Sequence, residues 1–389
     1  MSKYLGIYQN LAAIQSALNN SELAKPYVAL YENNTNIDYN SQALQHTFTI
    51  VSTISNTTII INGVERSSFT TAEGTVITWS VSKNGYVTQN GTYTLNTDHT
   101  ETITLEEEID YSTLYFTVKA LGTGTIVVNS PDDYYPDWNY SPTFLYKLNN
   151  NTWQTLLSGA NSTINVNNGD IIQFKGTYFY CGSGHPTNSI FYDSTVNYEV
   201  YGNILSLVYG DNFQSADIAY DADPDNWNTK NADIGAQTFY ALFSSDTHII
   251  SAANLILPDP FIDGCYWKMF YCCTNLTIAP ALPGTTLTDG CYSMMFYGCT
   301  SLTTAPILPA TTLVSSMSGE GHECYYYMFY GCSTLNYIEC LATDISASGL
   351  TNWVNGVAAS GTFVKATSMN NWTTGDNGIP SGWNVQNAS

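Results

Sequence analysis

The hydrophobic positions of the chain follow three patterns in turn. In the first 44 residues apolar side chains recur every three or four positions, the period of one helical face: Tyr4, Ile7, Tyr8, Leu11, Ile14 and Leu18. Asn19 and Asn20 end this helix, and a short strand is expected after Pro26. Such a helix is marginal alone in water and must bury its apolar face. Residues 1–44 are therefore either an ordinary first element or a docking segment for another protein.

Between residues 45 and 208 apolar and polar positions alternate, and turn residues interrupt them at short intervals. This pattern predicts antiparallel strands in two β-sandwich (Ig-like) modules, residues 45–110 and 111–208. Asn-Gly pairs supply the positive φ that tight hairpin turns need, and three occur in the first module: Asn62-Gly63, Asn84-Gly85 and Asn90-Gly91. In the second module, the Asn168-Gly169 pair predicts a hairpin between residues 163–166 and 171–174.

From about residue 236 the chain repeats itself. Two 23-residue stretches that begin at Cys265 and Cys291 agree at 16 positions, and a third copy begins at Cys324. One phenylalanine position occurs four times, the first in a degenerate copy: Phe243, Phe270, Phe296 and Phe329. A period of about 20 to 30 residues with Leu, Cys and Phe at fixed phases is typical of a leucine-rich-repeat solenoid. We expect this solenoid over residues 236–345, a cap over 346–389, and an acidic loop or linker over 209–235.

Each clear copy of the repeat carries a Cys-x7-Cys pair: Cys265 with Cys273, Cys291 with Cys299, and Cys324 with Cys332. Zinc sites need ligand pairs about two to four residues apart, so this spacing does not favour a metal. Stacked coils place like residues on like, which predicts two buried columns of thiols that act as small apolar fillers. Disulfides within a column are an alternative. The predicted fold class is mainly β and multi-domain, with a short N-terminal helix and strand anchor before the sandwiches and solenoid.

Composition and charge narrow the function. The chain has 32 acidic and 10 basic residues, a net charge of -22, which would repel a nucleic-acid backbone. No apolar run approaches the roughly 18 residues that cross a bilayer, and polar residues interrupt any signal-peptide core near the start. No motif for a catalytic nucleophile, a phosphate loop or a metalloprotease occurs. We therefore expect a non-enzymatic protein without a cofactor, without nucleic acid and without membrane insertion.

Three groups of residues are candidate binding sites. Asp221, Asp223, Asp225 and Thr229 begin like a calcium loop, yet Asn226 and Ala232 replace the glycine and glutamate it needs, which favours a solvated acidic loop. Cys181 and His185 have no second ligand pair nearby in the sequence. An aromatic cluster is a possible sugar- or protein-binding patch, although covering a sandwich edge explains it as well: Tyr134, Tyr135, Trp138 and Tyr140.

Several stretches resemble known families. "TIIINGVERSSFTTAEGTVITWSVSKNGYVTQNGTYTL" resembles PEGA-type β-sandwich modules, which are spacers on surface proteins. "CYSMMFYGCTSLTTAPILPATTL" and its copies, over residues 262–389, resemble BspA-type leucine-rich repeats, except that Cys272 replaces the usual glycine. Such repeats are associated with adhesion on surface and secreted proteins of gut Bacteroidales and their phages. The opening "KYLGIYQNLAAIQSALNNSELAKPYVALYENNTNIDYNS" is similar to that of virion proteins from crAss-like Bacteroides phages.

Together these resemblances imply a virion structural protein, a head or tail fibre or decoration on the particle surface. Residues 1–44 would dock on the capsid or another virion protein, and the repeats would face a glycan or protein of the host surface. Fibres of this kind are symmetric oligomers, and we favour a trimer, because symmetry multiplies weak contacts. The main alternative is a bacterial cell-surface or secreted adhesin, and a third is a glycan-active enzyme.

Overall fold

The structure is a computed structural model of the chain. It describes residues 44–129, 144–156, 161–176, 190–191, 193–215, 238–260, 263–314, 323–345 and 349–388. The chain divides into two compact units between Ile109 and Asp110. The described residues are mainly in strands and turns, which confirms the mainly β prediction, and no helix among them is long and apolar enough to cross a membrane. The predicted docking helix lies outside the described residues.

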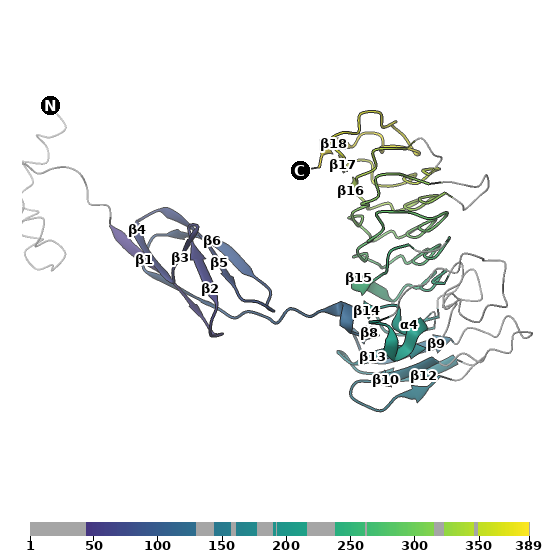
Figure 1. Ribbon diagram of the computed structural model, residues 1–389, viewed down its shortest axis with the longest axis horizontal. Helices are drawn as coiled ribbons and strands as arrows, with labels where there is room; N and C mark the ends of the chain where they lie inside the picture. Colours follow the sequence, from purple (N-terminus) through teal and green to yellow (C-terminus); the bar gives the residue numbers. More distant parts are fainter. Residues whose placement is uncertain are drawn as a thin grey trace, which may run out of the picture. The chain divides into compact units, whose positions relative to one another are not determined.

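The first unit contains two small sheets (Figure 1). One has the order β4-β1-β7, in which β1 runs antiparallel to β4 and parallel to β7. The other has the order β3-β2-β5-β6 and is antiparallel. The strands are β1 (Gln45–Ser52), β2 (Thr58–Ile61), β3 (Val64–Glu65), β4 (Ser68–Ala72), β5 (Thr75–Ser82), β6 (Gln89–Leu95) and β7 (His99–Ile103).

Alternating side chains of both sheets build one core in this unit, as the period of a half-buried strand requires. Phe48 and Ile50 of β1 are buried in it together with residues of the facing sheet: Ile61, Ile77, Val81 and Leu95. The two sheets therefore form a sandwich; its Ig-like assignment stays a prediction. The partly exposed rings of Tyr93 and His99 stack with centroids 4.0 Å apart.

One predicted turn of the first unit is wrong. Asn62 and Gly63 do have the positive φ angles of a tight hairpin, 50° and 76°. Asn90 and Gly91, by contrast, lie inside strand β6. Gly91 pairs with Trp79, and a Cβ added to this glycine would lie 2.7 Å from the indole ring. The glycine is thus needed for close packing of a ring on the strand, a role that the dipeptide alone does not distinguish from a turn.

The second unit begins with a six-stranded sheet of order β11-β10-β13-β8-β14-β15 and a two-stranded sheet of β12 and β9. Its short helical segments are η1 (Tyr111–Thr113), α4 (Ser206–Tyr209) and η2 (Gly210–Asn212). The strands of these two sheets are β8 (Phe116–Ala120), β9 (Gly124–Asn129), β10 (Phe144–Leu148), β11 (Gln154–Thr155), β12 (Asn161–Val166), β13 (Ile171–Gly176), β14 (Tyr198–Asn203) and β15 (Ile249–Ile256).

The predicted hairpin of the second module is also wrong. Gly169 does turn the chain, with φ of 88°. However, β12 pairs with β9, whereas β13 pairs with β8 and β10. The turn therefore carries the chain from one sheet to another. Local sequence marks the turn but does not determine which strands pair, because pairing depends on partners far along the chain.

Both sheets bury side chains in one core, and we call the sheets from β8 to β14 the sandwich region. Strand β14 joins this region to the repeats, because it pairs antiparallel with β8 and parallel with β15. A buried carboxylate strengthens the junction: Asp246, which is 0% exposed, accepts hydrogen bonds from the hydroxyl of Tyr198 and from the backbone N–H of His248. One hydrophobic core runs without interruption from Phe116 to Trp383. The sandwich region and the repeats are thus a single packed body; the predicted domain boundaries within it stay a prediction.

Successive copies of the repeat form coils that stack on one another (Figure 1). Within the Cys-x7-Cys stretch, backbone N–H groups alternate between two acceptors. The N–H of Phe270 donates to the carbonyl of Met295 in the next coil, 2.9 Å away, whereas that of Met269 donates to Tyr266 in its own coil, 3.1 Å away. This alternation satisfies the backbone without a helix or a regular strand. The later strands β16 (Tyr337–Cys340), β17 (Thr362–Lys365) and β18 (Asn384–Asn387) form a parallel sheet.

Candidate functional surfaces

Two columns of thiols lie inside the stacked coils. The predicted cysteines are all free and fully buried: Cys265, Cys291 and Cys324 in one column, Cys273, Cys299 and Cys332 in the other. In the second column each thiol donates to the carbonyl of a phenylalanine in the preceding coil; Cys273 reaches Phe243 at 2.9 Å and Cys299 reaches Phe270 at 3.1 Å. Burial raises the pKa of Cys332 to about 12. A thiol that stays protonated is a poor nucleophile, so these cysteines fill space and close backbone hydrogen bonds.

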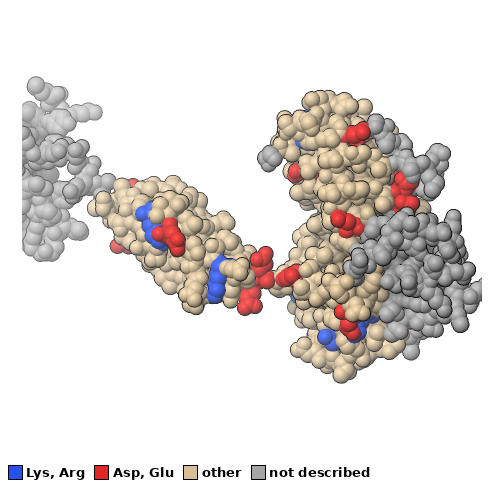
Figure 2. Space-filling model, in the orientation of Figure 1, with Lys and Arg blue, Asp and Glu red and all other residues tan. Residues whose placement is uncertain are grey.

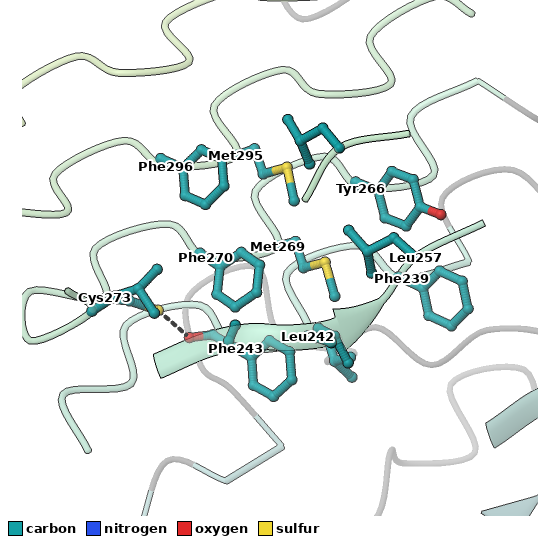
Figure 3. Close-up of a cluster of buried hydrophobic side chains, with 14 of the residues drawn as sticks. Phe239, Leu242, Phe243, Leu257, Tyr266, Met269, Phe270, Cys273, Met295 and Phe296 are labelled. Atoms are coloured by element: carbon teal, nitrogen blue, oxygen red, sulfur yellow. Dashed lines mark hydrogen bonds between the residues drawn. The ribbon is translucent and has the colours of Figure 1, made fainter. Parts of the chain in front are cut away.

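Aromatic rings form two further columns beside the thiols (Figure 3). In one, neighbouring rings lie 5.1 to 5.7 Å apart: Phe243, Phe270, Phe296 and Phe329. The other contains Phe239, Tyr266, Tyr292 and Tyr325. The first column begins on the sandwich core, where Phe243 stacks on Phe191 at 5.9 Å, and both columns end at Trp353. The repeat is thus fixed at both ends by large aromatic contacts.

A third set of rings stacks where side chains are half-exposed. Tyr271, Tyr297 and Tyr330, which we call the tyrosine column, come from successive coils. Their ring centroids are 4.7 and 4.8 Å apart, with interplanar angles of 16° and 10°. Tyr327 flanks the column, 5.1 Å from Tyr330, and its hydroxyl accepts a hydrogen bond from Asn352 at 2.8 Å. The column presents one ring edge per coil.

The tyrosine column was not predicted from the sequence, although the chain carries a signal for it. Met-Phe-Tyr occurs in each clear copy, ending at Tyr271, Tyr297 and Tyr330. In every copy the methionine and phenylalanine are buried and the tyrosine is not. A tyrosine that repeats at a position next to the core phenylalanine, and is itself kept out of the core, could have been identified as a surface feature.

Glycines run beside the tyrosine column. Gly298, Gly331 and Gly356, which we call the glycine column, have φ angles of 70°, 73° and 79°. They lie one above another, because a Cβ added to Gly331 would be 3.8 Å from the Cα of Gly298, and one added to Gly356 would be 3.3 Å from the Cα of Gly331. Cys272 occupies the equivalent place in the preceding coil with φ of 56°. Its side chain therefore ends the strip of bare backbone.

The positive φ angle of Cys272 favours glycine at this position. A side chain in the left-handed region costs about 1–2 kcal/mol, whereas glycine adopts it freely. We expect Cys272→Gly to raise the free energy of unfolding by about 0.5–1 kcal/mol, since the greater entropy of glycine in the unfolded chain offsets part of the gain. Urea unfolding measures this change. Cys272→Ala is the matched control, because it keeps the strained backbone; equal stabilisation by both variants would contradict the explanation.

The other predicted sites lie outside the described residues. These are the docking segment with Tyr4, Ile7, Tyr8, Leu11, Ile14 and Leu18, the aromatic patch with Tyr134, Tyr135, Trp138 and Tyr140, the acidic loop that begins at Asp221, and the pair Cys181 and His185. Within the part of the chain that the structure describes, no three His, Cys, Asp or Glu side chains gather closely enough to hold a metal ion.

The comparisons with known proteins concern the first unit. Residues 45–108 match the model of a family described as Head fiber dimeric protein-like domain. Over 61 residues, 16% of this chain, the chain is 39% identical to the Head fiber dimeric protein of Bacteroides phage crAss001. The match covers 50% of that protein, so the chain spans about half the length of this relative. No solved structure matches the chain.

This match shows a likeness to a head fibre protein of Bacteroides phage crAss001. A likeness to phage virion proteins was expected in the first 40 residues, whereas the match is found in residues 45–108. The stretch with the PEGA-type resemblance lies inside the matched residues. The PEGA-type and BspA-type assignments, and the leucine-rich-repeat class, stay predictions.

Proposed function

We propose that this chain is a non-enzymatic structural protein of a phage virion, a fibre that projects from the head. The observation that supports this best is the match of residues 45–108 to a domain named after head fibre proteins. Residues 1–44 dock on the capsid or on another virion protein. The stacked coils are presented outward, where they bind the host surface. The particle surface is therefore the location of the protein, and its partners are virion proteins at one end and a host ligand at the other.

The same domain name favours a homodimer over the trimer expected from the sequence. Sedimentation equilibrium distinguishes the two, because a chain of 42.7 kDa gives clearly different masses for a dimer and a trimer. A bacterial surface adhesin is the second candidate, favoured by the repeats, whose copies resemble those of secreted proteins. A signal peptide or lipid anchor on the native gene would support that candidate instead.

Removal of the docking segment tests the proposed function. We expect the full chain to co-purify with density-banded particles of the virus that encodes it, and a chain lacking residues 1–44 to stay in the supernatant. The truncated chain must give the same thermal unfolding as the full chain, so that loss of attachment is not loss of folding. As a matched control, the full chain with Tyr337→Ser should remain attached. Particles without the chain, or a truncated chain that still bands with them, would refute the proposal.

A further inference from the structure

We propose that the tyrosine column and the adjoining glycine column bind a neutral, linear polysaccharide that lies along the stacking direction of the coils. This rests on the host-binding part of the proposed function and names its ligand class and site. The site differs from the aromatic patch predicted from the sequence, since it lies on the repeats themselves.

The spacing of the rings favours a periodic polymer. Tyr271, Tyr297 and Tyr330 repeat once per coil at 4.7 and 4.8 Å. Because each ring covers the face of the next, what the column offers a ligand is a row of ring edges and hydroxyl groups. A protein partner usually inserts its contacts against open aromatic faces and pockets, which a closed stack does not provide. A polysaccharide carries hydroxyl groups at a regular repeat and can pair with such a row unit by unit.

The glycine column lets the polymer come close. Gly298 and Gly331 are partly exposed and Gly356 is exposed, and none of them carries a side chain that would cover the surface beside the rings. Tyr327 and Asn352 border the upper coils and are joined by a hydrogen bond of 2.8 Å. The rings have two rotatable side-chain bonds each and are already stacked, so little conformational entropy is lost on binding. The surface formed by the tyrosine and glycine columns is therefore preorganised for binding. At Cys272 a thiol side chain narrows this surface.

The negative net charge of the protein favours a neutral ligand over an anionic one. The chain carries a net charge of -22 with only 10 basic residues, so a polysaccharide of uronic acids or sulfated sugars would be repelled. Figure 2 shows one face of the protein, with acidic groups in several separate clusters among uncharged residues. At the lower end of the tyrosine column the ammonium group of Lys268 lies 5.3 Å from the ring centre of Trp267 and 5.8 Å from that of Tyr271. This cation therefore lies over aromatic rings.

Affinity electrophoresis of the full-length protein tests the inference. The gels contain a linear β-1,4-glucomannan, a linear β-1,3-glucan or, as the anionic probe, polygalacturonate. We expect retardation by at least one neutral probe and none by polygalacturonate. Tyr297→Ser with Tyr330→Ser should weaken binding about tenfold or more, since the ring edges are lost and the shorter serine hydroxyl does not reach the position of the phenol group. Tyr337→Ser, a half-buried tyrosine on β16 outside the column, should bind as the unchanged protein does.

A second variant separates binding from folding. Tyr297→Phe with Tyr330→Phe keeps both rings and their stacking but removes the hydroxyl row, and it should also weaken retardation while leaving the urea midpoint unchanged. Absence of retardation by both neutral probes, stronger binding of polygalacturonate, or full binding by the phenylalanine variant would overturn the inference. So would conversion of the oligomer to a monomer by these substitutions, because the column would then be a subunit contact. Particle attachment is measured separately, so failure of either proposal can be recognised alone.

Discussion

The second unit should unfold between about pH 9 and pH 10.5 under conditions in which it is stable at neutral pH. Burial raises the pKa of Cys324, Cys332 and Cys340 to about 12, and places those of Cys273, Cys291 and Cys299 well above the ordinary thiol value of 9.0. The folded chain therefore keeps protons that the unfolded chain releases. The stability these thiols contribute is fully present below pH 9 and is lost as the pH rises.

The size of this loss follows from the number of thiols. At one pH unit above the pKa of the unfolded chain, each thiol that stays protonated in the folded chain lowers the free energy of unfolding by about 1.4 kcal/mol. The six thiols together therefore lower it by about 8 kcal/mol near pH 10. Native domains are stable by only about 5–15 kcal/mol. Burial also raises the pKa of Tyr266 and Tyr325 well above 10.0, which adds to the loss at higher pH. Alkali should therefore remove most of the stability of the coils.

Urea unfolding at about pH 7.5, 9 and 10, with a phosphine reductant present, measures this loss of stability. Alkylation of cysteines during unfolding reports on the second unit alone, because residues 1–109 contain no cysteine. Cys299→Ala should be less stable at neutral pH, yet lose about 1.4 kcal/mol less than the unchanged protein by pH 10. Cys272→Ala, which replaces a half-buried thiol, should reduce the alkaline loss of unfolding free energy by less than Cys299→Ala does. An unfolding free energy independent of pH up to 10 would show that the thiols are not buried in the folded protein.

Much of the repeat region could be predicted from the sequence because its signals are periodic. Coils that stack place Cys273 next to Cys299 and Phe270 next to Phe296, so identical spacing in the sequence becomes contact in space. The direction of the tyrosines could not be derived in the same way. Spacing alone does not say that Phe270 points inward and Tyr271 outward, since the stretch is neither a helix nor a strand with a known period.

The failures in the sandwich regions share one physical cause. A glycine after an asparagine fits a turn, as at Gly63, or makes room for a ring, as at Gly91 beside Trp79. Which of these applies depends on the residue across the sheet, and the preceding strand β5 supplies that residue, Trp79. The junction between Tyr198 and Asp246 was likewise hidden, because the two residues are 48 positions apart and belong to stretches that look like separate domains.

Loss of Trp353 should destabilise the second unit by about 3–5 kcal/mol, the usual cost of truncating a buried tryptophan to alanine. Trp353 is 0% exposed and ends both ring columns, with centroids 6.3 Å from Tyr325 and 6.2 Å from Phe329. On its other side it stacks on Trp372 at 6.1 Å, and its indole N–H donates to the carbonyl of Gly378 at 2.9 Å. This single side chain therefore couples the last full coil to the C-terminal cap.

The loss of stability in Trp353→Ala should be uneven along the stacked coils. In a linear array each coil is stabilised by its neighbours, so removing the contact at one end frays that end first. In Trp353→Ala, hydrogen exchange should accelerate most in residues 349–388 and least around β15, which is held by β14. Trp353→Phe keeps a ring but loses the hydrogen bond to Gly378, and we expect about half the destabilisation. Val385→Ala, a half-exposed position in the same cap, should change exchange little. If Trp353→Ala accelerated exchange equally in β15 and β18, the coils would unfold as one cooperative block, and the aromatic columns would transmit the loss over the whole stack.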